Sequence, residues 1–257
     1  MPRRVAVVTG ASGGIGRETA VCLAEAGHDV VVAGRRRDAL ESTADAVRAV
    51  GQAALVVEAD VTEQLAVEAM WSTVMAEFGR VDCLVNNSGV PGPSAPFWEI
   101  DMDDWRATFQ VNVEGIVLCS RSVLPIMMAQ GGGNIVNIGS LTGKRPLINR
   151  TAYAASKLAV VGLTRTMALD AGPHGVRVNV VSPGPVAGER LDWVLDRLAE
   201  ATGSTQDQAR RDFAGQSALR RLVDPRDVAQ AVAFLASDAA AAITGIDLDV
   251  NAGFAMQ

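Results

Sequence analysis

The chain has 257 residues, of which 49% are hydrophobic and 20% are charged, and its formal net charge at pH 7 is −6. This balance is typical of a globular protein with a large apolar core, and it excludes an intrinsically disordered chain. The net negative charge, with arginines only in short and scattered runs, argues against a nucleic acid partner.

The cysteines Cys22, Cys83 and Cys119 are odd in number and have neither metal-ligand nor redox spacing. We therefore expect buried thiols in a reducing compartment, and no metal site. A strand-like run begins at Arg4, which leaves no room for a signal peptide. No uniformly apolar stretch reaches the length of about 18 residues that a membrane span needs. We expect a cytoplasmic protein without membrane contact.

The hydrophobic pattern alternates between short continuous apolar runs and segments with helical periodicity. The runs expected to form strands cover residues 5–8, 30–33, 55–57, 83–85, 135–138, 178–181 and 248–250. The expected helices lie at about residues 15–26, 37–50, 63–78, 102–128, 151–171 and 226–236. Continuous apolar strands separated by helices indicate a parallel sheet covered on both faces. The sequence therefore predicts one α/β domain over residues 1–257, a Rossmann-type doubly wound sheet of seven parallel strands.

One segment, residues 185–222, interrupts this alternation. Its polar-rich pattern predicts two helices, near residues 191–201 and 205–214. An insertion before the last strand lies at the carboxyl edge of the sheet, where open α/β sheets bind ligands. We expect this segment to form a helical lid over the substrate.

The first strand runs into a glycine-rich loop, Thr9 to Gly16, which opens the first helix. Glycines let the backbone turn sharply and approach a pyrophosphate, whose charge then lies at the helix N-terminus. A plain tight turn is the alternative, but the strand–loop–helix context favours dinucleotide binding. The residues expected to contact the cofactor here are Gly10, Ser12, Gly13, Gly14, Ile15 and Gly16.

The end of the second strand bears on which cofactor is used. An acidic residue there would bind the ribose of NAD, whereas an arginine accommodates the 2′-phosphate of NADP. Gly34 is followed by three arginines, and no acid precedes Asp38. We predict NADP(H), with NAD(H) as the alternative, and Arg35 as the main partner of the phosphate, followed by Arg36. A solvated basic helix start would give the same pattern.

Two further strand ends offer cofactor contacts. Asp60 and Val61 follow the third strand, where the Asp60 carboxylate could accept a hydrogen bond from the adenine amino group. An ordinary helix cap is the alternative for Asp60. Asn87, Ser88 and Gly89 follow the fourth strand and would supply amides and a tight backbone beside the cofactor.

The only tyrosine of the chain, Tyr153, lies four residues before Lys157, which is one of two lysines. On a helix these positions share a face, so the phenol and the ammonium can meet. A neighbouring cation stabilises phenolate and lowers the pKa of the phenol. The pair predicts a group that donates and accepts protons near neutral pH, although a pair on a solvated helix face would look the same.

Taken together, these motifs resemble the short-chain dehydrogenase/reductase family, in its short single-domain branch. The chain is similar to 3-oxoacyl-ACP-reductase-like oxidoreductases of that family. The resemblance runs from Val5 to about Gly253 and is carried by the Thr9–Gly16 loop, the Asn86–Gly89 motif, Asn112, Ser140, Tyr153, Lys157 and Pro183-Gly184. It implies hydride transfer between a nicotinamide cofactor and a small-molecule carbonyl or secondary alcohol.

The resemblance also implies a role for each catalytic position. Tyr153 would be the general acid in reduction and the general base in oxidation. Lys157 would lower the pKa of the tyrosine and bind the nicotinamide ribose, which Tyr153 also contacts. Ser140 would hydrogen-bond the substrate oxygen, and Asn112 would hold a water that relays protons to Lys157.

Beside the nicotinamide, the resemblance implies contacts from Pro183, Gly184 and the backbone of Val186. The family often has a threonine near position 188, where this chain has Gly188, and Ser88 replaces the more common alanine. The resemblance further implies a homotetramer, or a homodimer, built on the helix around Asn112 and the helix that carries Tyr153.

The substrate would be bound by the loops after strands four to six. The candidate substrate contacts are Trp98, Leu141, Arg150, Arg190 and Trp193. Four cations in these loops, Lys144, Arg145, Arg150 and Arg190, could attract an anionic substrate. Lys144 by itself is interpreted as a solvated loop charge.

Other functions remain open at this point. An NAD-dependent catabolic dehydrogenase of the same family would share the catalytic residues. A non-catalytic dinucleotide-binding sensor or scaffold is disfavoured by the complete set of Asn112, Ser140, Tyr153 and Lys157. An enoyl reductase is disfavoured because that branch spaces its tyrosine and lysine more widely.

Overall fold

The computed structural model describes residues 3–188, 191–192, 194–196, 199 and 203–256. These residues form a seven-stranded sheet in the order β3-β2-β1-β4-β5-β6-β7, and every neighbouring pair of strands is parallel. The strands are β1 (Arg4–Thr9), β2 (His28–Gly34), β3 (Ala54–Glu58), β4 (Cys83–Asn86), β5 (Gly133–Ile138), β6 (Val176–Pro183) and β7 (Asp247–Val250). The predicted doubly wound parallel sheet is confirmed.

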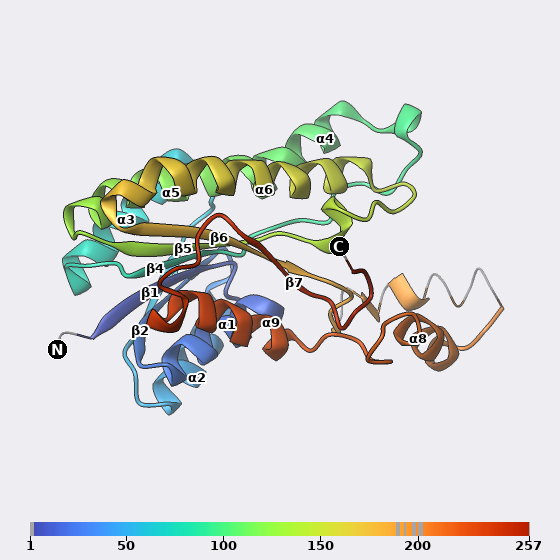
Figure 1. Ribbon diagram of the computed structural model, residues 1–257, viewed down its shortest axis with the longest axis horizontal. Coiled ribbons are helices and arrows are strands. Elements are labelled where there is room, and N and C mark those ends of the chain that lie inside the picture. The colour runs from blue at the N-terminus through green and yellow to red at the C-terminus, as the bar shows by residue number, and fades with distance from the viewer. Residues whose placement is uncertain (1–2, 189–190, 193, 197–198, 200–202, 257) are drawn as a thin grey trace.

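Helices cover both faces of the sheet, as Figure 1 shows. One face carries α1 (Gly14–Glu25), α2 (Arg37–Ala49) and α9 (Pro225–Ala236). The other face carries α3 (Gln64–Phe78), α5 (Gly115–Ala129) and α6 (Thr151–Ala171), with α4 (Met102–Phe109) leading into α5. Most of the helix ends lie within one residue of the positions expected from the sequence.

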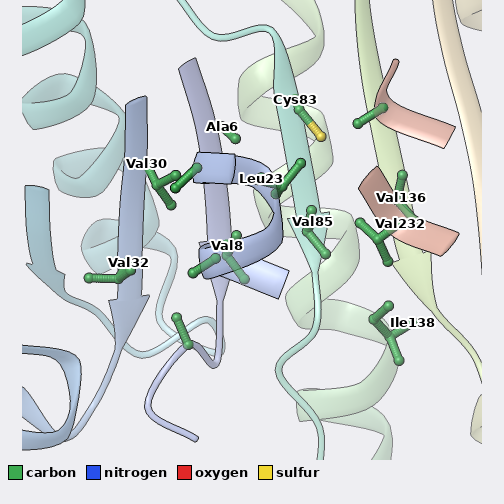
Figure 2. Packing of buried hydrophobic residues seen from close by; sticks show 14 of the residues in the cluster. Ala6, Val8, Leu23, Val30, Val32, Cys83, Val85, Val136, Ile138 and Val232 are labelled. Atoms are coloured by element: carbon green, nitrogen blue, oxygen red, sulfur yellow. The ribbon is translucent and has the colours of Figure 1, made fainter. Parts of the chain in front are cut away.

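The strands read as continuous apolar runs because both of their faces are buried. All seven residues of β2 are buried. Val30 and Val32 pack with Leu23 of α1 in one core cluster, shown in Figure 2, whereas Val31 belongs to the cluster on the opposite face. Since successive side chains of a strand point to opposite faces, a core on both sides of the sheet makes most strand positions apolar.

The topology places the loops that follow β1, β2 and β4 next to one another. β1 lies between β2 and β4. The chain adds β2 and β3 on one side of β1 and then crosses over to add β4 and the later strands on the other side. A crevice forms at such a switch point, outside the carboxyl ends of the strands. The glycine-rich loop, the arginine run and the Asn86–Gly89 motif meet at this crevice.

The expected long helix at residues 102–128 is interrupted by a π-helical turn, Gln110–Glu114, between α4 and α5. By length and composition, Met102–Ala129 could cross a membrane, with a mean hydropathy of 1.4 in its most apolar window. Such a helix is weak evidence of a span, because a core helix passes the same test. Here Cys119, Val123 and Met127 of α5 are fully buried against the sheet.

The insertion before β7 contains α8 (Gln206–Ala214), which lies beyond the carboxyl end of the sheet in Figure 1. The side chain of Thr205 caps α8 by accepting a hydrogen bond from the backbone of Gln208 at 3.2 Å. Residues 191, 192, 194–196 and 199, where the first lid helix was expected, are helical. Leu195 is fully buried there and belongs to one cluster with Ala209 of α8.

Candidate active site

A cleft of about 1030 Å³ runs along the carboxyl edge of the sheet. It brings together most of the residues that the sequence singled out. These are Gly10, Ser12, Gly13, Gly14, Ile15, Gly16, Arg35, Arg36, Asp60, Val61, Asn87, Ser88, Gly89, Ser140, Arg150, Tyr153, Lys157, Pro183, Gly184 and Val186. Residues from six strand ends therefore share one elongated cavity.

The glycine-rich loop is shaped to bring its backbone close to a ligand. Gly10 has a φ of +63°, a conformation that favours glycine. A Cβ at Gly16 would collide with the carbonyl oxygen of Gly10, so the loop closes tightly on itself. A Cβ at Gly13 or Gly14 would meet nothing within 4 Å. The N-terminus of α1 thus faces open space in the cleft, which fits the pyrophosphate of a dinucleotide.

The loop after β4 holds the glycine-rich loop in place. The Asn87 side-chain amide donates to the carbonyl oxygens of Thr9 and Gly10, each at 3.0 Å. The Thr9 hydroxyl accepts from the backbone N–H groups of Asn87 and Ser88 at 3.0 and 3.2 Å. Asn87 therefore supports the glycine-rich loop and also lines the cleft.

Two arginines lie at the end of the cleft beside the glycine-rich loop. Arg35 forms an ion pair with Asp60 at 3.6 Å, and Arg36 donates to the Ser12 hydroxyl at 3.3 Å. The Arg35 side chain is 71% exposed, so this ion pair contributes little free energy and is easily exchanged for a ligand. Two cations beside the loop that suits a pyrophosphate also suit a 2′-phosphate.

Asp60 also takes part in a local turn. Its carboxylate accepts from the backbone N–H of Thr62 at 3.0 Å and from the Thr62 hydroxyl at 2.8 Å. Burial alone would raise the pKa of Asp60, but the bonds from Thr62 and the charge of Arg35 outweigh it and lower the pKa. The carboxylate is thus held ionised. It stabilises the local turn through Thr62, in addition to any contact that it makes with adenine.

Asn112 lies in the π-helical turn and is fully buried. Its side-chain oxygen accepts from the backbone N–H of Val90 at 2.8 Å. Its amide group donates to the Val90 carbonyl and to the Ser156 hydroxyl, both at 3.0 Å. Both amide hydrogens are therefore committed to joining the loop after β4 to α6. The sequence did not single out Ser156, because no pattern links positions so far apart in the chain.

Tyr153 and Lys157 lie one turn apart on α6, as the sequence predicted. The Lys157 ammonium is 5.9 Å from the centroid of the tyrosine ring, and it donates to the Ile138 carbonyl at 2.8 Å. Lys157 is only 4% exposed. The guanidinium of Arg150 lies 5.2 Å from the same ring centroid. Two cations therefore lie near the ring of the tyrosine.

Ser140 begins the 3₁₀ turn after β5 and lines the cleft together with Tyr153. Its side-chain oxygen accepts from the backbone N–H of Thr142 at 3.1 Å. This bond orients the serine side chain. The Ser140 hydroxyl can still donate a hydrogen bond of its own to a substrate oxygen. Thr142 also lines the cleft and was not singled out from the sequence, although its place two residues after Ser140 is a usable signal.

Two of the candidate substrate residues, Trp98 and Leu141, do not line the cleft as the sequence predicted. Trp98 lies in the 3₁₀ turn Phe97–Glu99, is 82% exposed, and is not among the residues that line the cleft. Leu141 is only 5% exposed, and it is not among the residues that line the cleft either. Arg190 and Trp193 lie outside the described residues.

The interpretation of Lys144 as a solvated loop charge is wrong. Its ammonium lies 2.5 Å from Asp249 and 2.9 Å from Asp247, and its side chain is only 14% exposed. Burial by itself lowers the pKa of Lys144, but hydrogen bonding and attraction to the two carboxylates outweigh it and raise the pKa. The charge is therefore permanent and joins the Ser140 loop to β7. The pattern could not reveal this because the acids lie far along the chain, Asp249 being 105 residues away.

Known proteins resemble this chain along nearly its whole length. A model of the short chain dehydrogenase family matches residues 4–197. The chain belongs to the short-chain dehydrogenase family. A relative named cis-4-hydroxycyclohexanecarboxylate dehydrogenase, from Sinomonas cyclohexanicum, is 40% identical over 98% of this chain and 96% of its own.

Solved structures of the family superpose closely on this dehydrogenase. A variant of the actinorhodin polyketide ketoreductase with NADPH has a TM-score of 0.93 and 34% identity, and the match covers 98% of this chain and 97% of that one. Xylitol dehydrogenase with bound NAD⁺ has a TM-score of 0.91 and 34% identity, with 96% and 97% covered. The protein is therefore an oxidoreductase of alcohols and ketones that uses a nicotinamide dinucleotide.

The ion cluster at Lys144 leads to a stability prediction. Replacing Lys144 with Met leaves two largely buried carboxylates without their cation, which we expect to lower the free energy of unfolding by about 3–5 kcal/mol. Urea denaturation measures this change. As a control, Arg106→Met removes an ion pair to an Asp103 side chain that is 90% exposed, and it should cost less than about 1 kcal/mol. Equal effects of the two substitutions would contradict the structural role of Lys144.

Proposed function

We propose that this short-chain dehydrogenase is an NADP(H)-dependent carbonyl reductase in which Tyr153 is the general acid and base. One observation carries the proposal. A single cleft is lined both by Ser140, Tyr153 and Lys157 and by Arg35 and Arg36. In this proposal the chain acts as one domain, and a small ketone or secondary alcohol is its substrate.

The cofactor would lie along the cleft. Its pyrophosphate would rest on Gly13 and Gly14 at the start of α1, and its 2′-phosphate would meet Arg35 and Arg36. When bound, it supplies or accepts the hydride. Lys157 would hold the nicotinamide ribose. Pro183, Gly184 and Val186 would border the nicotinamide itself, since all three line the cleft on the side of β6.

The proton steps belong to the residues of α6 and of the Ser140 loop. In reduction, the Tyr153 hydroxyl gives its proton to the carbonyl oxygen as that oxygen gains negative charge. The Ser140 hydroxyl donates a hydrogen bond to the same oxygen and stabilises the developing charge. The Lys157 ammonium stabilises the phenolate that remains. In oxidation, the phenolate removes the proton from the alcohol.

Reprotonation of Tyr153 would proceed through Lys157 and water near Asn112. A Cβ at Gly89 would lie 3.5 Å from the Lys157 ammonium and 3.3 Å from the Asn112 side-chain oxygen, so the two groups are neighbours. Both amide hydrogens of Asn112 already donate to protein oxygens, so they are not available to a relaying water. Such a water would instead donate hydrogen bonds to oxygen atoms, such as main-chain carbonyls. We propose that Asn112 contributes mainly by fixing this local geometry.

A cytoplasmic location suits the chemistry of the cysteines. Cys22, Cys83 and Cys119 are buried and free. Burial raises the pKa of Cys83 and of Cys119 to about 12, so both thiols stay protonated and unreactive. Free thiols are typical of proteins from a reducing compartment.

Tyr153→Phe tests the catalytic assignment. The substitution removes only the hydroxyl, so we expect kcat to fall by at least ~100-fold while NADPH still binds. Steady-state reduction of a ketone and quenching of tryptophan fluorescence by NADPH measure the two effects. Full activity in the Phe variant would sink the proposed mechanism.

Arg35→Ala tests the cofactor assignment. Losing a charge-assisted hydrogen bond to the 2′-phosphate should weaken NADPH binding by roughly 10- to 100-fold and leave NADH binding unchanged. Arg37→Ala is the matched control, because Arg37 pairs with Glu41 on the surface of α2. If the wild-type protein prefers NADH, the oxidising, NAD-dependent alternative replaces this proposal.

Assembly as a homotetramer, or as a homodimer, is part of the proposal. On α6, Leu158 and Leu169 are 53% and 78% exposed, and a Cβ at Gly162 between them would meet nothing. These positions share one helix face, which a second copy could cover. We expect sedimentation equilibrium to show a tetramer or dimer that Leu158→Glu plus Leu169→Glu dissociates. Leu65→Glu on α3 is the control, and a monomeric wild-type protein would contradict the proposal.

A further inference from the structure

The part of the cleft lining that comes from the segment after β6 is mostly apolar. It includes Pro185, Val186, Ala187, Leu191 and Val194. Among the described residues that line the whole cleft, charged side chains occur at Arg35, Arg36 and Asp60 near the cofactor loop, at Lys157, and at Arg150. Arg150 is therefore the charged side chain of the described lining that neither the cofactor nor the proton relay uses.

The structure fixes the position of Arg150 closely. It is the residue before α6, and its carbonyl accepts from the backbone N–H of Ala154 at 2.8 Å. Its guanidinium donates to the Pro91 carbonyl at 2.7 Å and lies 5.2 Å from the centroid of the Tyr153 ring. A cation held between two loops at the wall of the reacting pocket is preorganised, so little entropy is lost when it binds an anion.

Two neighbouring cations of the same rim are bound elsewhere in the chain. Lys144 is neutralised by Asp247 and Asp249. Arg145 lies with its guanidinium 4.6 Å from the ring centroid of Phe254, and it donates to the Phe254 carbonyl at 3.3 Å. Of these three rim cations, Arg150 is the one that lines the cleft, so it is the one that a bound substrate can reach.

We propose that the substrate is a ketone, or the matching secondary alcohol, that carries a carboxylate close to its reacting carbon, and that Arg150 binds this carboxylate. The inference rests on the proposed carbonyl reduction and deepens it. A carboxylate that enters an apolar cleft loses its hydration and needs a cation beside it, and a guanidinium matches its two oxygens. Because Arg150 lies over the ring of Tyr153, the carboxylate must be separated from the reacting carbon by no more than a small ring or a short chain.

A matched pair of ketones tests this proposal. The probes are 4-oxocyclohexanecarboxylate and its neutral amide, 4-oxocyclohexanecarboxamide, which has nearly the same shape. We expect wild-type kcat/KM to be at least ~30-fold higher for the acid, and this preference to fall to near unity in Arg150→Gln. Arg150→Lys should retain part of it. The ratio of the two substrates cancels any general effect of Arg150 on Tyr153.

Arg145→Gln is the matched control, since it removes a cation of the same loop that lies on Phe254. It should keep the preference for the acid. A second readout measures binding without turnover. Each ketone is titrated calorimetrically into the protein saturated with NADP⁺, which has no hydride to transfer to the ketone. The acid should bind the wild-type complex more tightly than the amide, and Arg150→Gln should remove the difference. Unchanged NADP⁺ affinity in Arg150→Gln shows that the cleft is intact.

The outcomes separate this inference from the proposed function. If wild-type protein reduces the acid and the amide equally well, the carboxylate inference is wrong while carbonyl reduction stands. If the preference survives in Arg150→Gln, or is lost in Arg145→Gln, Arg150 is not the residue that binds the carboxylate. If the acid is preferred in binding but neither ketone is reduced with NADPH or NADH, the inference stands and the proposed activity is what fails.

Discussion

The two-faced burial of the parallel sheet is the constraint on which the rest of this structure depends. Helices cover both faces, and strands such as β2 have no exposed residue, so the interior of the sheet cannot hold ligands. Chemistry is confined to the strand ends, and parallel strands bring all of their carboxyl ends to one edge. The order of the strands around β1 then decides which loops meet there.

Several loops at that edge are joined to a neighbouring element by hydrogen bonds or ion pairs. Asn87 holds the glycine-rich loop, and Asn112 holds the loop after β4 against α6. Lys144 fastens the Ser140 loop to β7, and Arg150 bonds to the carbonyl of Pro91. Several of these contacts are buried or charge-assisted, which makes them strong and directional. The reacting groups are thereby preorganised before any ligand arrives.

The charge distribution of the protein is uneven in a way that suits its ligands. The chain carries a net charge of −6, yet the side chains that face the cleft include Arg35, Arg36, Arg150 and Lys157. Elsewhere, Lys144 and Arg226 are paired with carboxylates. A positive cleft within an acidic protein attracts anions locally and repels them from other surfaces. A phosphorylated dinucleotide and a carboxylate substrate both fit this pattern.

The sequence alone determined the parallel sheet, the glycine-rich loop and the spacing of Tyr153 and Lys157, because these depend on local periodicity and on residues close in the chain. It could not determine that Lys144 is buried between Asp247 and Asp249, that Ser156 holds Asn112, or that Trp98 lies outside the cleft. Nor could it separate Arg150 from the other rim cations. These contacts join residues of different elements, and only the packing of those elements decides which charges meet and which side chains face the cavity.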